Sequence, residues 1–221
     1  MTAVRLAAID ATGLSLDALV VGLTGGKRET KVEMPPSAGL GTGGRKRILD
    51  ALRKLGVKPK VGEVIKLPGI NGIEAPLIVC VPIGAPVEEV TPELLRRAAG
   101  AATMSINGVE RVGIAMPCTN PAEVAATAQG AVLGSYRFEN FRGAGTPTPV
   151  RGPKTVTVLT DTHRDRHVRE AVRQAEIVAT EVCRARDLVN TPPSALHPKE
   201  LAAEALAAVA GLEVTTQVLD E

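Results

Sequence analysis

The sequence predicts an α/β fold in which a mixed sheet is flanked by helices. Short apolar, β-prone runs alternate along the chain with segments of helical periodicity, the order typical of layered α/β domains. Leu77–Ile83 is apolar almost throughout, as expected for a strand buried on both faces of a parallel or mixed sheet. Thr91-Pro92 and Asn120-Pro121 each place a capping residue before proline, which is a signature of helix starts.

The first half of the chain is expected to hold four strands and one helix. Val4–Ile9 and Ala18–Leu23 are short apolar runs separated by turn residues. Arg45–Leu55 carries one apolar stripe at helical spacing and a basic back. Val61–Leu67 and Leu77–Ile83 again have strand composition.

The middle of the chain repeats the alternation of helix and strand. A helix should begin after Thr91 and run to about Asn107, and Arg111–Met116 should be the next strand. A helix rich in small residues should follow Asn120 and continue to Tyr136. Phe141–Lys154 has loop composition, and Thr155–Thr160 alternates as a late strand.

A long amphipathic helix is expected from Asp165 to Asn190, ended by the Pro192-Pro193 pair. Pro198–Ala210 should form a further helix capped by Gly211, and Leu212–Leu219 a weakly alternating strand. This order predicts three segments. They are an N-terminal α/β domain over residues 1–164, an inter-domain helix over 165–190, and the truncated start of a second α/β domain over 191–221.

Composition limits the classes of partner. The formal net charge of +2 gives no general attraction to polyanions, so nucleic acid is an unfavoured partner. Cys80, Cys118 and Cys183 form an odd set without metal-type spacing, which predicts buried, reduced thiols. No run reaches the about 18 apolar residues that span a bilayer, and the N-terminus has no secretory pattern. We therefore expect a cytoplasmic protein without a membrane partner.

A glycine-rich stretch contains G-x-G-x-x-G at Gly39, Gly41 and Gly44. A dinucleotide fingerprint needs a strand directly before it, but Pro35-Pro36 precede this one. Arg45-Lys46 also replace the Lys-Ser/Thr of a P-loop. A surface loop is favoured, and phosphate contact through backbone amides is the alternative.

Two polar groupings have a chemical and a structural interpretation. His163 and His167, flanked by Asp161 and Asp165, could share a metal, but capping and solvation of a helix start is favoured because no further ligand follows. The basic segment Arg45–Lys60 is the best nucleic-acid patch, but it lacks interleaved aromatic residues. A solvated helix face is therefore the favoured interpretation.

Two further features are expected to be structural. Cys118 follows Met116-Pro117 at a strand end, where a nucleophile can occur, but packing is favoured because no histidine lies near it in sequence. Tyr136–Phe141 holds all the aromatic residues and is expected to plug the end of a helix, with a ligand platform as the alternative.

Two separated stretches resemble the leucyl (cytosol) aminopeptidases. Gly130–Phe141 is similar to the Gly-x-x-Leu-x-x-Tyr-x-Phe-x-x-Tyr/Phe-Lys/Arg stretch that closes the N-terminal domain of that family. Ala185–Pro193 reads Ala-Arg-Asp-Leu-Val-Asn-Thr-Pro-Pro and resembles the family signature that follows the inter-domain helix. Ser194 stands where many members have Asn, and Val218–Glu221 resembles the family's early Val-x-Asp-Glu run.

The resemblance implies a macro-domain-like N-terminal domain, a linking helix and the first elements of a catalytic domain. Family members are cytoplasmic homohexamers that remove N-terminal residues, often leucine, from peptides. They use two divalent metal ions, Mn or Zn, held by a lysine and several carboxylates. The Asn-Thr-Asp-Ala-Glu-Gly-Arg signature that supplies some ligands is absent from these residues, so no catalytic, cofactor-binding or metal residue is assigned.

The resemblance thus predicts that this portion serves assembly and domain positioning and is inactive alone. Its partners would be the remaining catalytic domain, copies of itself in a hexamer, and peptide substrates of the whole protein. Two alternatives stay open. A macro-type module could bind ADP-ribose or another nucleotide through Gly39–Gly44, and a DNA-binding regulatory domain could use Arg45–Lys60.

Overall fold

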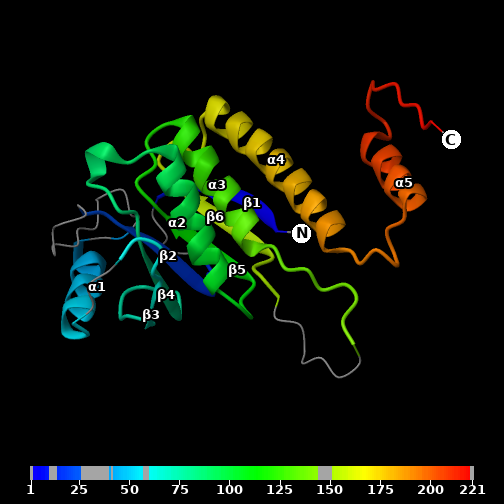
Figure 1. Cartoon of the computed structure of the whole chain (residues 1–221). Helices are drawn as coiled ribbons and strands as arrows, with labels where there is room; N and C mark the ends of the chain where they lie inside the picture. Colours follow the sequence, from blue (N-terminus) through cyan, green and yellow to red (C-terminus); the bar gives the residue numbers. More distant parts are fainter. Residues whose placement is uncertain are drawn as a thin grey trace.

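A computed structural model describes residues 2–9, 14–25, 40, 42–56, 60–143 and 151–219. Its centre is a six-stranded mixed sheet of strand order β1-β6-β5-β2-β4-β3 (Figure 1). All neighbouring strands pair in parallel except β3, which runs antiparallel to β4 at one edge. The strands are β1 Ala3–Ala7, β2 Ala18–Leu23, β3 Ile65–Pro68, β4 Leu77–Pro82, β5 Arg111–Ala115 and β6 Thr155–Leu159.

Helices cover both faces of the sheet. The helices are α1 Thr42–Lys54, α2 Pro92–Ser105, α3 Pro121–Ser135, α4 Arg166–Asn190 and α5 Pro198–Val209, with a short 3-10 turn at Val87–Glu89. Helices α2 and α3 lie side by side on one face, α4 packs against α3, and α1 packs on the opposite face (Figure 1). The α/β layering expected from the sequence is confirmed.

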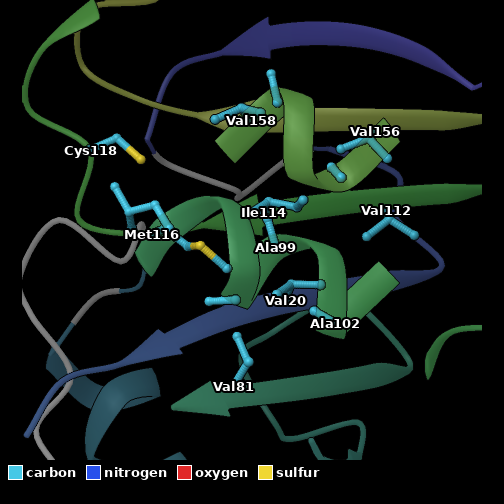
Figure 2. Close-up of a cluster of buried hydrophobic side chains, with 14 of the residues drawn as sticks. Val20, Val81, Ala99, Ala102, Val112, Ile114, Met116, Cys118, Val156 and Val158 are labelled. Carbon is cyan, nitrogen blue, oxygen red and sulfur yellow. The ribbon is translucent and has the colours of Figure 1, made fainter. Parts of the chain in front are cut away.

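The largest core lies between the sheet and the α2–α3 layer. Figure 2 shows Val20, Val112 and Ile114 on the strands together with Ala99 and Ala102 of α2. All six residues of β2 are buried, because β2 lies in the interior of the sheet with helices on both faces. Burial of apolar side chains at this layer provides the main driving force for folding.

Small residues bring α2 and α3 unusually close. A Cβ atom on Gly130 would lie 2.1 Å from the backbone oxygen of Arg96, and one on Gly134 would lie 2.2 Å from the backbone oxygen of Gly100. The two helices therefore pack backbone against backbone. The predicted caps of both helices are present, since Thr91 and Asn120 accept hydrogen bonds from the backbone N–H groups three residues later.

Some expected element limits are wrong. Helix α1 begins at Thr42, so Gly43 and Gly44 are helical, and β3 begins only at Ile65 because a turn with Gly62 at φ +83° precedes it. Residues 212–219 form no strand, and no neighbouring strand pairs with them among the described residues. The C-cap residue of α5 is Ala210, and Gly211, expected to end the helix, follows it with φ +83°.

Helix α5 lies beyond the end of α4, apart from the α/β layers (Figure 1). It buries none of its residues in the described structure. None of the described helices has both the length and the apolar character needed to cross a membrane.

Candidate functional site at the junction of α3 and α4

Tyr136, the residue that caps the C-terminus of α3, contacts three side chains from the end of α4. Its ring lies under the Arg186 guanidinium, 3.9 Å from ring centroid to Cζ. Its hydroxyl donates a 2.8 Å hydrogen bond to Asp187 Oδ1 and accepts a 3.1 Å bond from Asn190 Nδ2. Positions 186, 187 and 190 share one face of the helix, so a single helix surface supplies all three contacts. We call these four residues the Tyr136 junction.

Arg186 and Thr191 satisfy backbone oxygens at the ends of α3 and α4. Arg186 Nη1 donates 3.0 Å to the backbone oxygen of Leu133, one of the last carbonyls of α3. The backbone oxygen of Asp187 accepts from both the N–H and the hydroxyl of Thr191, at 3.0 and 2.7 Å. Carbonyls in the last turn of a helix have no partner inside it, so these bonds terminate α3 and α4 together.

The environment of Tyr136 keeps its hydroxyl protonated. Burial raises the pKa of the phenol above its ordinary value, and the Asp187 carboxylate acts in the same direction. The hydrogen bond from Asn190 acts in the opposite direction, but the net pKa is raised. A neutral phenol is a hydrogen-bond donor, which is the role the contact with Asp187 requires.

Arg137 ties the same end of α3 to α2. Its guanidinium donates to the backbone oxygens of Gly134, Tyr136 and Met104 and to the side chain of Asn107, at 2.8 to 3.1 Å. Four acceptors leave this cation little capacity for a ligand. Arg137 therefore serves as a structural anchor for the junction.

A cleft of about 570 Å³ lies beside the Tyr136 junction, between α3, α4 and the segment that leads into β6. Its lining includes Glu139, Lys154 and Cys183, together with Tyr136 and Asp187 of the junction. Lys154 is paired with Glu110, whereas Glu139 Oε1 is buried and has no hydrogen-bond partner among the described residues. The cleft is thus shaped by the residues that join α3 to α4.

The glycine-rich stretch is only partly described. Gly39 and Gly41 lie outside the described residues. Gly44 lies in the first turn of α1, where a Cβ atom, if one were present, would lie 3.6 Å from the side chain of Ile73. The alternative of phosphate contact therefore stays a prediction.

The His163–His167 grouping forms a helix start. Asp165 is the N-cap of α4 and accepts 2.8 Å from the backbone N–H of His167. His163 Nδ1 lies 3.2 Å from the backbone oxygen of Thr160. Within the described ranges, no three His, Cys, Asp or Glu side chains gather as metal ligands. Asp165 thus caps the start of α4, as expected.

The basic helix and Cys118 also have structural roles. Ile48 and Leu52 bury one side of α1, while Arg53 pairs with Asp50 at 3.1 Å on the exposed side. Lys58 lies outside the described residues. Cys118 is buried with Sγ 3.1 Å from Thr127 Oγ1, and burial raises the pKa of its thiol to about 12. Cys118 therefore packs in the core, as expected from the sequence.

The expected aromatic plug is only partly correct. Phe138 and Phe141 stack with centroids 6.3 Å apart, but Phe141 is 61% exposed and has a positive φ of 61°. The contacts of Tyr136 with Arg186, Asp187 and Asn190 of α4 were not expected from the sequence. The available signal was that Tyr136 lies in Gly130–Phe141, and that Gly130–Phe141 and Ala185–Pro193 are the two stretches with family resemblance.

Comparison with known proteins gives a consistent result. Residues 20–144 match the family model described as "Cytosol aminopeptidase family, N-terminal domain". Proteins named "Probable cytosol aminopeptidase" from Streptomyces avermitilis and Streptomyces coelicolor are 36% and 35% identical and are matched by the whole chain. The chain spans 45% and 46% of the length of these relatives.

Solved structures give the same fold. The bottromycin maturation enzyme BotP is 27% identical with a TM-score of 0.61, over 90% of this chain and 38% of the BotP chain. A second BotP structure is described as a complex with Mn. A tomato leucine aminopeptidase mutant has a TM-score of 0.67 at 21% identity, over 95% of this chain and 42% of its own.

Proposed function

Because this chain belongs to the cytosol aminopeptidase family, we propose that it is the N-terminal part of a peptide-hydrolysing aminopeptidase and that it positions the catalytic domain. The observation that carries this role is the Tyr136 junction. The two stretches with family resemblance lie far apart in the sequence, yet Tyr136 of one contacts Arg186, Asp187 and Asn190 of the other. The end of the linking helix α4 is thereby fixed to the α/β layers.

Exposed apolar residues on α4 and α5 support a role in domain contact. Val178, Val182 and Val189 are 51%, 42% and 85% exposed, and they lie along one stripe of α4. Leu201 and Leu206 of α5 are also exposed. In the proposal, a further domain of the same protein covers these side chains, since burying each one would contribute about 1.5–3 kcal/mol.

The reaction itself is assigned to residues outside this chain. The family resemblance implies two divalent metal ions, and one BotP structure is described with Mn. The donor set here does not fit such a centre, because the described residues provide no cluster of three or more His, Cys, Asp or Glu side chains. In the proposal, residues 1–164 are the N-terminal domain, 165–190 the linking helix and 191–221 the start of the catalytic domain. A homohexameric assembly in the cytoplasm belongs to the same proposal.

An activity comparison tests this division of roles. The full-length protein and the 221-residue chain would each be incubated with leucyl-p-nitroanilide and Mn²⁺. We expect turnover by the full-length protein and none by the chain alone. Turnover by the isolated chain, or a full-length protein that cleaves no N-terminal residue from any peptide, would contradict the proposal.

A further inference from the structure

A second hollow, of about 430 Å³, lies between the sheet edge and the first turns of α4, away from the Tyr136 junction. Its floor is apolar and consists of Val4 and Leu6 of β1 and Val172 of α4. Strand β1 is at the edge of the sheet, since it pairs only with β6. Positively charged side chains surround this floor, namely Arg164, Arg169 and Arg173.

The one carboxylate that lines this hollow, that of Glu176, accepts a backbone hydrogen bond from β1. The backbone N–H of Ala3 and the backbone oxygen of Ala7 bond to the β6 side of β1. Successive residues of a strand alternate in direction, so the N–H of Val4 points to the open edge of the sheet. Glu176 Oε1 accepts that N–H at 3.0 Å. Glu176 keeps its negative charge, but one of its oxygens is bonded to an otherwise unpaired edge amide, and three arginines outnumber this one carboxylate in the lining.

The guanidinium groups of these arginines have hydrogen-bond donors that are not used within the described structure. The guanidinium groups of Arg164 and Arg169 make no hydrogen bond or ion pair with any residue that the structure describes, and that of Arg173 pairs with Glu170 at 3.4 Å. Each guanidinium offers five N–H donors in a planar fork that matches the oxygens of phosphate or carboxylate. Three such groups at the rim of one apolar hollow give a surplus of positive charge and of donors.

We propose that this hollow binds a small molecule that carries phosphate or carboxylate groups. The oxyanion accepts hydrogen bonds from Arg169 and Arg173, with Arg164 adding charge, while the remainder of the ligand lies over Val4, Leu6 and Val172. Charge-assisted, bidentate bonds of this kind are among the stronger polar contacts available to a protein. The residues of the hollow lie outside residues 20–144, the part that the family model matches.

Isothermal titration calorimetry at low ionic strength tests the proposal, with pyrophosphate and citrate as probes. We expect saturable binding of at least one probe. The variant R169Q/R173Q should bind that probe at least about tenfold more weakly, because it loses the bidentate contacts. The variant R53Q/R97Q is a matched control, since it removes the same charge from exposed arginines elsewhere, and its affinity should be unchanged.

The two probes distinguish phosphate from carboxylate as the preferred group. The mutated arginines are exposed, so both variants should keep the native circular dichroism spectrum. Absence of saturable binding by either probe would overturn the proposal. Equal weakening in both variants would also overturn it, because the attraction would then be general electrostatics and not this site.

Discussion

Tyr136 and Asp187 lie 51 residues apart in the sequence and are joined by a 2.8 Å hydrogen bond from the phenol to the carboxylate. Because Asn190 donates to the same hydroxyl, one oxygen atom links the C-terminus of α3 to the last turns of α4. Family resemblance in these two stretches thus corresponds to one physical contact. We expect the orientation of α4 to depend in part on that contact.

Replacing Tyr136 by Phe should loosen α4 without disturbing its packing. The ring and its contact with Arg186 are kept, while the hydrogen bonds with Asp187 and Asn190 are lost. We expect the free energy of unfolding to fall by about 0.5–1.5 kcal/mol, the usual net value of such bonds. Urea denaturation followed by circular dichroism measures this change.

A double-mutant cycle with Asn190→Ala provides the control for Tyr136→Phe. Since both residues share one hydrogen bond, their effects should be less than additive. Strict additivity of the two changes in free energy would show that the Tyr136 hydroxyl is not coupled to Asn190 across the two helices.

Gly130→Ala should separate α2 from α3. The new Cβ atom would lie 2.1 Å from the Arg96 backbone oxygen. A backbone atom cannot relieve this clash by a change of rotamer, so the helices must move apart. Overpacking of this kind costs about 1–3 kcal/mol. Thermal unfolding of the variant measures the loss.

Gly43→Ala is the matched control, because Gly43 is also helical but a Cβ atom there meets nothing within 4 Å. Alanine has the higher helix propensity, so this variant should be unchanged or more stable by up to about 1 kcal/mol. Equal stability of the Gly130 and Gly43 variants would contradict the close packing of α2 on α3.

Local rules predicted the elements of this fold because the signals lie within a few residues. The caps at Thr91 and Asn120 need only a side chain and an N–H three positions away. The apolar run at Leu77–Pro82 reflects burial on both faces, which any central strand of the sheet experiences. These features were therefore visible without knowledge of the tertiary structure.

Contacts between distant segments could not be derived in this way. The periodicity of α4 predicts an apolar stripe that is buried only in part, since Val182 and Val189 are exposed. It does not indicate that Arg186 lies over Tyr136 or that Glu176 accepts the edge amide of Val4. The alternation over 212–219 suggested a strand, but strand formation requires a neighbour, and the described residues supply none. Side-chain partners across helices depend on how the layers pack, which the sequence pattern leaves undetermined.

The ion pair between Asp17 and Arg111 should make stability depend on pH. Arg111 Nη2 lies 2.8 Å from Asp17 Oδ1, and Asp17 Oδ2 accepts the backbone N–H groups of Arg111 and Glu110 at 2.8 and 3.1 Å. Hydrogen bonding from Arg111 lowers the pKa of Asp17 from 3.8 to about 2, against the opposing effect of burial. The carboxylate form is thus favoured in the folded state.

A lowered carboxyl pKa contributes stability above the unfolded-state pKa, and this contribution is lost as pH falls toward the folded-state value. We expect Asp17 to contribute about 1 kcal/mol at neutral pH after solvent screening of the partly exposed pair, and this contribution to disappear between about pH 5 and pH 2. Asp17→Asn should therefore be less stable than wild type at pH 7, and the difference should shrink toward zero at pH 2. Urea titrations across this range measure the difference, with Asp50→Asn as a control because its partner Arg53 is exposed. A wild-type advantage over Asp17→Asn that stays constant from pH 7 to pH 2 would show that the charge of Asp17 does not stabilise the fold.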